Sequence, residues 1–206
     1  MPVVLVANPK GGVGKSTLAT NIAGYLASRG HAVMLGDIDR QQSSRLWLGL
    51  RPREARVIRS WDASEDGEVV RPPRGTTHAV IDTPAGLHGS RFKEAVAVAD
   101  KVLVPLQPSI FDIYATRDFL DKLLSHRHAE KTQIALIGMR VDARTLAADR
   151  LREFVAGLDV PVLGELRDTQ NYVQLAARGL TLFDISPGRV QRDLEQWEPI
   201  CRWVDR

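Results

Sequence analysis

Residues 8–17 read NPKGGVGKST, and they decide the fold because of what stands on either side of them. The apolar run Val3 to Val6 comes before them, and a helical pattern begins at Leu18. A buried strand that turns through small residues into a helix can point consecutive backbone N–H groups at phosphate oxygens, and the helix N-terminus adds its partial positive charge. The stretch therefore predicts a phosphate-binding loop between a strand and a helix.

Each residue type in this loop suits one part of a bound nucleotide. Lys15 would reach the β- and γ-phosphates, the Ser16 hydroxyl would bind Mg²⁺, and Thr17 offers a second hydroxyl near the α-phosphate. The alternative is a glycine-rich turn without a ligand, which the strand, the helix and the two lysines disfavour. The predicted nucleotide contacts in the loop are Lys10, Gly11, Gly12, Val13, Gly14, Lys15, Ser16 and Thr17.

The loop departs from the usual G-x-x-x-x-G-K-[ST] pattern, because Pro9 stands where the first glycine would be and a second lysine, Lys10, precedes the glycine pair. In this form, K-G-G-x-G-K-S, it resembles the deviant Walker A loop of the ParA/MinD family of ATPases. The resemblance implies ATP and Mg²⁺ as cofactors and a homodimer that forms when ATP is bound. It also implies catalytic roles for both lysines, with Lys10 reaching the partner protomer's phosphates as an arginine finger does in trans.

Two carboxylates, Asp37 and Asp39, follow the buried run Ala32 to Leu35. At the C-terminal end of a strand in an α/β sheet, such groups are placed to orient a water or a hydrated Mg²⁺. The segment matches the family's D-x-D-P-Q motif, which implies that Asp39 positions the attacking water and that Asp37 supports the metal and the loop lysine. The family proline is Arg40 here, which adds a cation and leaves the shape of the next turn open. A surface pair of Asp37 with Arg40 is the alternative.

The run Ala79 to Asp82 is a short apolar strand that ends in an aspartate, and a Pro/Gly turn through Gly86 follows it. This is the pattern of a Walker B strand with a switch loop. Asp82 would hold Mg²⁺ through a water, and the backbone N–H of Gly86 could sense the γ-phosphate. The alternative is a buried aspartate that caps the next helix. The predicted metal group is Ser16, Asp37 and Asp82.

Residues 105–112 read PLQPSIFD and resemble the family's V-P-x-Q-P-S-x-x-D segment. No general chemistry demands this string, so it favours ParA-like ancestry over other phosphate-loop proteins, and the resemblance places it at the dimer face. Physically it predicts a rigid turn with Asp112 capping a helix. The helix would bury Ile113, Thr116, Leu120 and Leu123.

The adenine is expected at the ends of two later strands, Ile134 to Ile137 and Val162 to Leu163. By position, the residues that would flank the base are Arg140, Leu166, Arg167 and Asp168. Arg140 stands where the family often carries asparagine.

Composition narrows the class of protein. With 206 residues, of which 44% are hydrophobic, the chain predicts one domain over residues 1–206. The lone Cys201 excludes a disulfide framework and a zinc or iron–sulfur site made from this chain's own cysteines, and it fits the cytoplasm. No leader or membrane-spanning run is apparent, so we expect a soluble, cytoplasmic protein.

The net charge of +3 is a mild excess, so any argument for DNA binding depends on where the arginines fall. A last helix is expected to pack Val190, Leu194, Trp197, Cys201 and Val204 on one face. The arginines off that face are the predicted DNA contacts, namely Arg189, Arg192, Arg202 and Arg206, with Arg51, Arg53 and Arg167 in reserve.

The predicted fold is a doubly wound α/β domain with a mostly parallel sheet of about seven strands and helices on both faces. Because the loop begins at residue 8, the sequence resembles the short ParA type without an N-terminal helix-turn-helix. The implied function is an ATPase that binds DNA non-specifically at the nucleoid and positions cargo, stimulated by a ParB-like or adaptor partner. The alternatives are a MinD-like membrane-cycling regulator, which Glu195, Glu198 and Pro199 disfavour, and a metabolic synthetase.

Overall fold

The structure is a computed structural model that describes residues 1–65 and 68–206. The central strands of the sheet are buried almost throughout, because helices cover their apolar runs on both faces, whereas the two edge strands are partly exposed. The strands are β1 (Val3–Val6), β2 (Val33–Asp37), β3 (Ile58–Trp61), β6 (His78–Asp82), β7 (Lys101–Leu106), β8 (Gln133–Met139) and β9 (Val162–Leu166), with a separate antiparallel pair, β4 (Ser64–Glu65) and β5 (Glu68–Val69).

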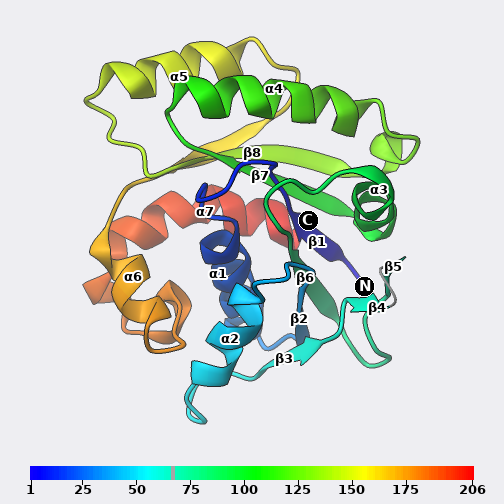
Figure 1. Ribbon diagram of the computed structural model, residues 1–206. Helices are drawn as coiled ribbons and strands as arrows, with labels where there is room; N and C mark the ends of the chain where they lie inside the picture. The colour runs from blue at the N-terminus through cyan, green and yellow to red at the C-terminus, as the bar shows by residue number, and fades with distance from the viewer. Residues whose placement is uncertain (66–67) are drawn as a thin grey trace.

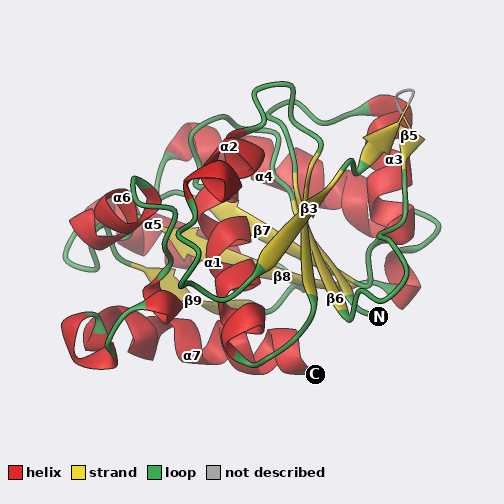
Figure 2. Cartoon of the chain, turned by 90° about the horizontal axis from the view of Figure 1, so that it is seen from below, coloured by secondary structure: helices red, strands yellow, loops and turns green. Residues whose placement is uncertain are grey.

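Seven-residue to fifteen-residue helices connect these strands and pack in two layers (Figures 1 and 2). The helices are α1 (Lys15–Ser28), α2 (Ser43–Leu50), α3 (Gly89–Val98), α4 (Ile110–Leu124), α5 (Leu146–Ala156), α6 (Gln170–Ala176) and α7 (Gln191–Asp205), and the 3-10 turns are η1 (Ala129–Lys131), η2 (Leu182–Asp184) and η3 (Pro187–Arg189). Helices α3, α4 and α5 lie on one face of the sheet, and α1, α2, α6 and α7 lie on the other.

The strand order is β3-β2-β6-β1-β7-β8-β9, and every neighbouring pair in this sheet is parallel. The chain builds one side of the sheet from β1, returns to β1, and then builds the other side. A ligand crevice forms where the order reverses, at the C-terminal end of the central strand. This confirms the predicted doubly wound fold and places residues 8–17 at that crevice.

The alternation of side chains along β1 divides the core in two. Val4 and Val6 face α1 and α7, whereas Val3 and Leu5 face α3 and α4. The predicted apolar face of α4 is buried as expected. In α7, Trp197, Ile200 and Val204 are buried against the sheet, which confirms core packing of that helix.

Three local predictions were wrong. Helix α1 begins at Lys15 rather than at Leu18, and α2 was not anticipated. Asp112 does not cap α4: the residue before the helix is Ser109, and Asp112 lies in the first turn. Helix ends are difficult to locate from periodicity alone, because the first turn carries little apolar signal.

Candidate nucleotide-binding site

Glycines and a buried asparagine shape the phosphate loop. Gly14 has a φ of 93°, and a side chain there would place its Cβ 2.7 Å from the Met139 Cε. The Asn8 amide is buried and donates to the Pro105 carbonyl at 2.8 Å and to Thr116 Oγ1 at 3.0 Å, while its oxygen accepts the Lys10 N–H at 2.8 Å. Asn8 therefore ties the loop to β7 and α4, a task that sequence reasoning missed.

Lys15 lies over the loop in the position expected of a phosphate-binding lysine. Its side chain is largely buried, and Nζ donates to the Lys10 carbonyl at 2.7 Å. Burial lowers the pKa of Lys15, and the negative charges of Asp82 and Asp39 oppose that shift. A cation held in this way can exchange a neutral carbonyl for anionic phosphate oxygens.

Asp82, at the end of the predicted Walker B strand, is the most deeply buried carboxylate of the site, with 1% of its surface exposed. Its Oδ2 accepts the Ser44 hydroxyl at 2.5 Å. Burial raises the pKa of Asp82 to about 6, and the hydroxyls of Ser16 and Ser44 limit the rise. Within the described residues, Oδ1 is buried without a hydrogen-bond partner.

That unpartnered oxygen tests whether the site fits Mg²⁺. A hard cation prefers carboxylate and hydroxyl oxygens and keeps several waters. Ser16, at the start of α1, lies close enough to Asp82 to lower its pKa, so both predicted ligands converge. The donor set fits a hydrated Mg²⁺ held by Ser16 and Asp82.

Asp37 has a different task from the one predicted. Its Oδ1 accepts the Asp39 N–H at 2.9 Å, and its Oδ2 accepts the N–H groups of Ser44 at 2.8 Å and Arg45 at 3.3 Å. Burial raises the pKa of Asp37, against these hydrogen bonds. Because backbone N–H groups occupy both oxygens, Asp37 anchors the first turn of α2 rather than offering a free oxygen to the metal.

Asp39 remains available for water positioning. It is partly exposed, its Oδ1 accepts the Gln41 N–H at 3.0 Å, and it lines a cavity of about 570 Å³ together with Arg40 and residues 84–91. The turn after Arg40 closes through Gln42, which has a left-handed φ of 49°. The structure thus defines the turn whose shape the sequence left open, because Arg40 replaces the family proline there.

The switch loop contacts the phosphate loop directly. Thr83 Oγ1 donates to the Val6 carbonyl at 2.9 Å, and the Gly86 N–H donates to the Pro9 carbonyl at 2.8 Å. The N–H group that was predicted to sense the γ-phosphate therefore has an internal partner in this structure. Gly86 has a φ of 70°, which a glycine adopts at little cost.

The adenine prediction is corrected in part. Strands β8 and β9 pair at Met139 and Leu166, so Arg140 and Arg167 do follow neighbouring strand ends. Leu166, however, is fully buried in the core beneath α7 and cannot contact a base with its side chain.

Arg167 is also engaged elsewhere. Its Nε donates to Asp193 Oδ1 at 2.6 Å, and the Asp193 side chain is fully buried. Arg140 and Asp168 are exposed and remain candidates. Arg140 has a φ of 53°, a conformation that asparagine tolerates better than arginine.

The four predicted DNA contacts are all exposed, but they do not share one helix. Arg189 lies in η3 before α7, Arg192 lies in the first turn of α7, and Arg202 lies 3.6 Å from Glu198. Of the reserve candidates, Arg53 is exposed and Arg167 pairs with Asp193. The prediction that Arg51 contacts DNA is wrong, because its guanidinium is buried and donates to both oxygens of Asp184 at 2.9 and 2.7 Å.

The amino-acid sequence is similar to those of known nucleotide-binding proteins. Residues 4–182 match the model of the CobQ/CobB/MinD/ParA nucleotide binding domain. The chain is 28% identical over 188 residues to maintenance of carboxysome distribution protein A of Halothiobacillus neapolitanus, covering 87% of this chain and 86% of that protein. It is 28% identical over 181 residues to the chromosome-partitioning ATPase Soj of Thermus thermophilus, covering 72% and 73%.

Solved structures agree on the fold. The cell division protein MinD of Aquifex aeolicus superposes with a TM-score of 0.75 at 19% identity, covering 99% of this chain and 96% of that chain. A plasmid partition protein of Borrelia burgdorferi bound to AMPPNP gives a TM-score of 0.73 at 20% identity, covering 98% and 99%. With the family model spanning most of the sequence, the chain belongs to the CobQ/CobB/MinD/ParA family of nucleotide-binding domains, which includes the ParA/MinD P-loop ATPases.

Proposed function

We propose that this protein is a slow, partner-stimulated ATPase that dimerises on ATP, binds DNA without reading its sequence, and positions a cargo in the cytoplasm at the nucleoid. The names of the relatives, a carboxysome distribution protein and a chromosome-partitioning ATPase, support cargo positioning. The cargo would be a plasmid, a chromosome or a protein complex, and a ParB-like or adaptor protein would stimulate hydrolysis.

The proposed dimer rests on exposed apolar side chains at the start of α4. The first turns of α4 expose three large apolar side chains, Ile110, Phe111 and Tyr114, with Phe111 exposed by 74%. They lie next to the phosphate loop, because Gln107 just before them donates to the Gly12 carbonyl at 2.9 Å. An exposed apolar patch of this kind marks an interaction surface.

Lys10 lies at the same edge of the molecule. It is partly exposed, and its charge acts on the buried Asp112 in the first turn of α4, opposing the rise that burial causes in the Asp112 pKa. A second copy docked on the apolar residues of α4 would bring its nucleotide close to this lysine. That arrangement supports a role for Lys10 in trans.

In this reading the chain's own residues have separate tasks. Backbone N–H groups of the loop and Lys15 bind the phosphates, and Ser16 and Asp82 would hold Mg²⁺, which supplies charge neutralisation when bound. Asp39 orients the attacking water, and Asp37 keeps Asp39 in place through its N–H. The switch loop reports on the γ-phosphate through Gly86.

The test separates the parts of the proposal. Lys10→Ala should still bind ATP in calorimetry but lose the ATP-dependent dimer in size-exclusion chromatography, together with turnover. Lys131→Ala, at an exposed lysine outside α4 and outside the phosphate loop, is the matched control and should behave as wild type. A full dimer with normal turnover in Lys10→Ala would refute the trans role.

DNA binding needs its own experiment. The ATP-bound dimer should retain DNA of any sequence at about 50 mM salt and lose most of it by about 200 mM, because several phosphate contacts release counterions. Reversing Arg189 and Arg192 to glutamate should weaken retention without changing the ATPase rate measured without DNA. Failure of the wild-type dimer to retain DNA at low salt would refute DNA binding, and normal retention by the double variant would refute these two contacts.

The packing of α7 disfavours the membrane-cycling alternative. Within residues 1–65 and 68–206, no helix combines the length and apolarity that crossing a bilayer requires. The apolar face of α7 packs on the sheet through Trp197 and Ile200, so it is not free to insert into a lipid surface. Vesicle flotation with ATP tests this, and we expect no flotation.

A further inference from the structure

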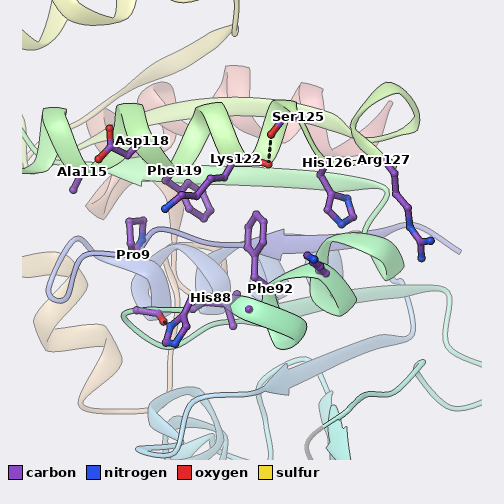
Figure 3. A pocket seen from close by; sticks show the side chains of 14 residues that line it. Pro9, His88, Phe92, Ala115, Asp118, Phe119, Lys122, Ser125, His126 and Arg127 are labelled. Carbon is purple, nitrogen blue, oxygen red and sulfur yellow. Dashed lines mark hydrogen bonds between the residues drawn. The ribbon is translucent and has the colours of Figure 1, made fainter.

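A groove of about 980 Å³ runs between α3 and α4 and reaches the phosphate loop at one end (Figure 3). Four lining residues share one face of α4, namely Ala115, Asp118, Phe119 and Lys122, and the turn after the helix extends this wall through Ser125, His126 and Arg127. The opposite wall is α3 with the switch loop before it. The lining residues central to the groove are Leu87, Phe92, Lys93, Phe119, Lys122 and His126.

The floor of the groove is apolar and aromatic. The Phe92 and Phe119 rings meet edge to face with centroids 5.5 Å apart, and Phe92 and His126 meet in the same way at 6.2 Å. Figure 3 shows Phe92 rising from α3 toward α4, with Phe119 on that helix and His126 in the turn that follows it. Leu87 of the switch loop completes this floor. An apolar floor of this kind is suited to apolar side chains of an occupant.

The rim of the groove is positively charged. Lys93, Lys122 and Arg127 are exposed, and none of them forms an ion pair within the described part of the chain. Asp118 is the opposing carboxylate in the lining. Burial lowers the pKa of His126, and the charges of His128, Arg127 and Lys93 lower it further. The field at the rim therefore favours an anionic occupant.

We propose that this groove docks an acidic amphipathic helix of a partner protein, with apolar side chains on the aromatic floor and carboxylates against the lysine and arginine rim. The part of its wall that lies within α4, from Ala115 to Lys122, is about 10 Å long at 1.5 Å per residue, which matches about two turns of a bound helix, and Ser125 to Arg127 extend the wall beyond it. A DNA backbone would match the charge but has no apolar group for the floor. This inference rests on the proposed function, because the docked helix would belong to the partner that stimulates ATP hydrolysis.

The groove is also coupled to the nucleotide site. Its lining includes Pro9 and Gly86, the two residues joined by the hydrogen bond between the switch loop and the phosphate loop. The His88 ring nitrogen contacts the Gly86 carbonyl from the same side. An occupant that touches Leu87 and His88 will therefore prefer one position of the switch loop over another, and by linkage its affinity will depend on the bound nucleotide.

The experiment uses a fluorescein-labelled, end-capped peptide of about 15 residues, with leucines spaced to form one helical stripe and glutamate and alanine elsewhere. Fluorescence anisotropy with the full chain should show saturable binding at low salt, whereas a matched peptide with lysine in place of glutamate should not bind. The variant Lys93→Glu/Lys122→Glu should weaken binding about tenfold or more. Ala115→Trp, which fills the groove without a charge change, should also weaken it.

The control variant is Lys131→Glu/Arg178→Glu, which makes the same charge change at exposed positions outside the lining and should bind the peptide as wild type does. Equal binding by the groove variant and the control variant would overturn the proposal, as would absence of binding by the wild type. Loss of DNA rather than peptide binding in the groove variant would assign the rim to DNA and overturn it too. Equal peptide affinity with AMPPNP and with ADP would overturn the coupling.

Failure of this inference is distinguishable from failure of the proposed function, because ATP binding and basal ATPase activity are measured on the same proteins. If the protein binds and hydrolyses ATP but does not bind the peptide, only the groove proposal is refuted. If the protein binds the peptide but does not bind ATP, only the proposed function is refuted.

Discussion

Replacing Asp82 by asparagine should stabilise the ligand-free protein at neutral pH, although it removes a metal-binding oxygen. Burial raises the pKa of this carboxyl from 3.8 to about 6. Between those values the folded protein holds a proton that the unfolded chain has released. The contribution of Asp82 to the free energy of unfolding is therefore fully present below about pH 4 and is lost as the pH rises through about 6.

The magnitude follows from the same shift. A difference of about 2 pKa units corresponds to about 3 kcal/mol, which the ionised, 1% exposed carboxylate costs the folded state at pH 7.5. Asparagine does not ionise, and its carbonyl can still accept the Ser44 hydroxyl. A new amide N–H without a good partner costs about 1–3 kcal/mol. The expected net gain is about 0–2 kcal/mol, at most roughly 8 °C in Tm for a chain of this size.

The assay is urea unfolding of wild type and Asp82→Asn, in EDTA without nucleotide, at about pH 4.5 and about pH 7.5. The stability difference should favour the variant at the higher pH and shrink or reverse at the lower. Mg²⁺ with ATP should then stabilise the wild type more than the variant, because the variant keeps the phosphate loop but lacks one metal-binding oxygen. Asp121→Asn on the exposed face of α4 is the control and should show no such pH dependence.

Two results would refute the reasoning. If Asp82→Asn were less stable than wild type at neutral pH without Mg²⁺, ionisation of the buried Asp82 carboxyl would not destabilise the folded protein as we infer. If both proteins showed the same pH dependence, the pKa of Asp82 would not be raised.

Lys15→Ala should abolish ATP binding, because the loop loses its buried cation, and unchanged affinity in calorimetry would contradict the loop assignment. Asp39→Ala should bind ATP and form the dimer yet hydrolyse very slowly, since water positioning alone is removed; a wild-type rate in a phosphate-release assay would move that role elsewhere. Arg51→Ala should lose about 3–5 kcal/mol in chemical unfolding, because it leaves Asp184 buried and unpaired. Arg53→Ala, exposed nearby, should change stability by less than about 0.5 kcal/mol.

Much of the fold could be predicted because its signals are local. The apolar runs that became β1, β6, β7 and β8 are continuous in the sequence, and the loop at residues 8–17 stands between a strand and a helix. Strand order then follows from few alternatives, because crossovers in such folds are restricted. The meeting of Lys15 and Asp82 at one site could also be predicted locally, from the motif that each occupies.

The remaining features depend on partners that are distant in the sequence. Arg167 looks like a loop cation until Asp193, 26 residues later, is found buried beside it. Arg51 looks like part of a basic patch, yet its partner Asp184 lies 133 residues away. Ser44 carried no motif, although its N–H and hydroxyl bind Asp37 and Asp82. A carboxylate in a strand-end motif gives no sign of whether the backbone already occupies its oxygens.

The Gly86 N–H donates to the Pro9 carbonyl, so this carbonyl and a γ-phosphate oxygen would compete for the same donor. Binding of a nucleotide is then an exchange in which internal contacts break as phosphate contacts form, and Lys15 must leave the Lys10 carbonyl in the same way. Charged oxygens win this exchange because they accept stronger hydrogen bonds than a neutral carbonyl does. A diphosphate has no γ-oxygen to offer Gly86, so we expect ADP to leave the switch loop bound to Pro9 and only a triphosphate to release it.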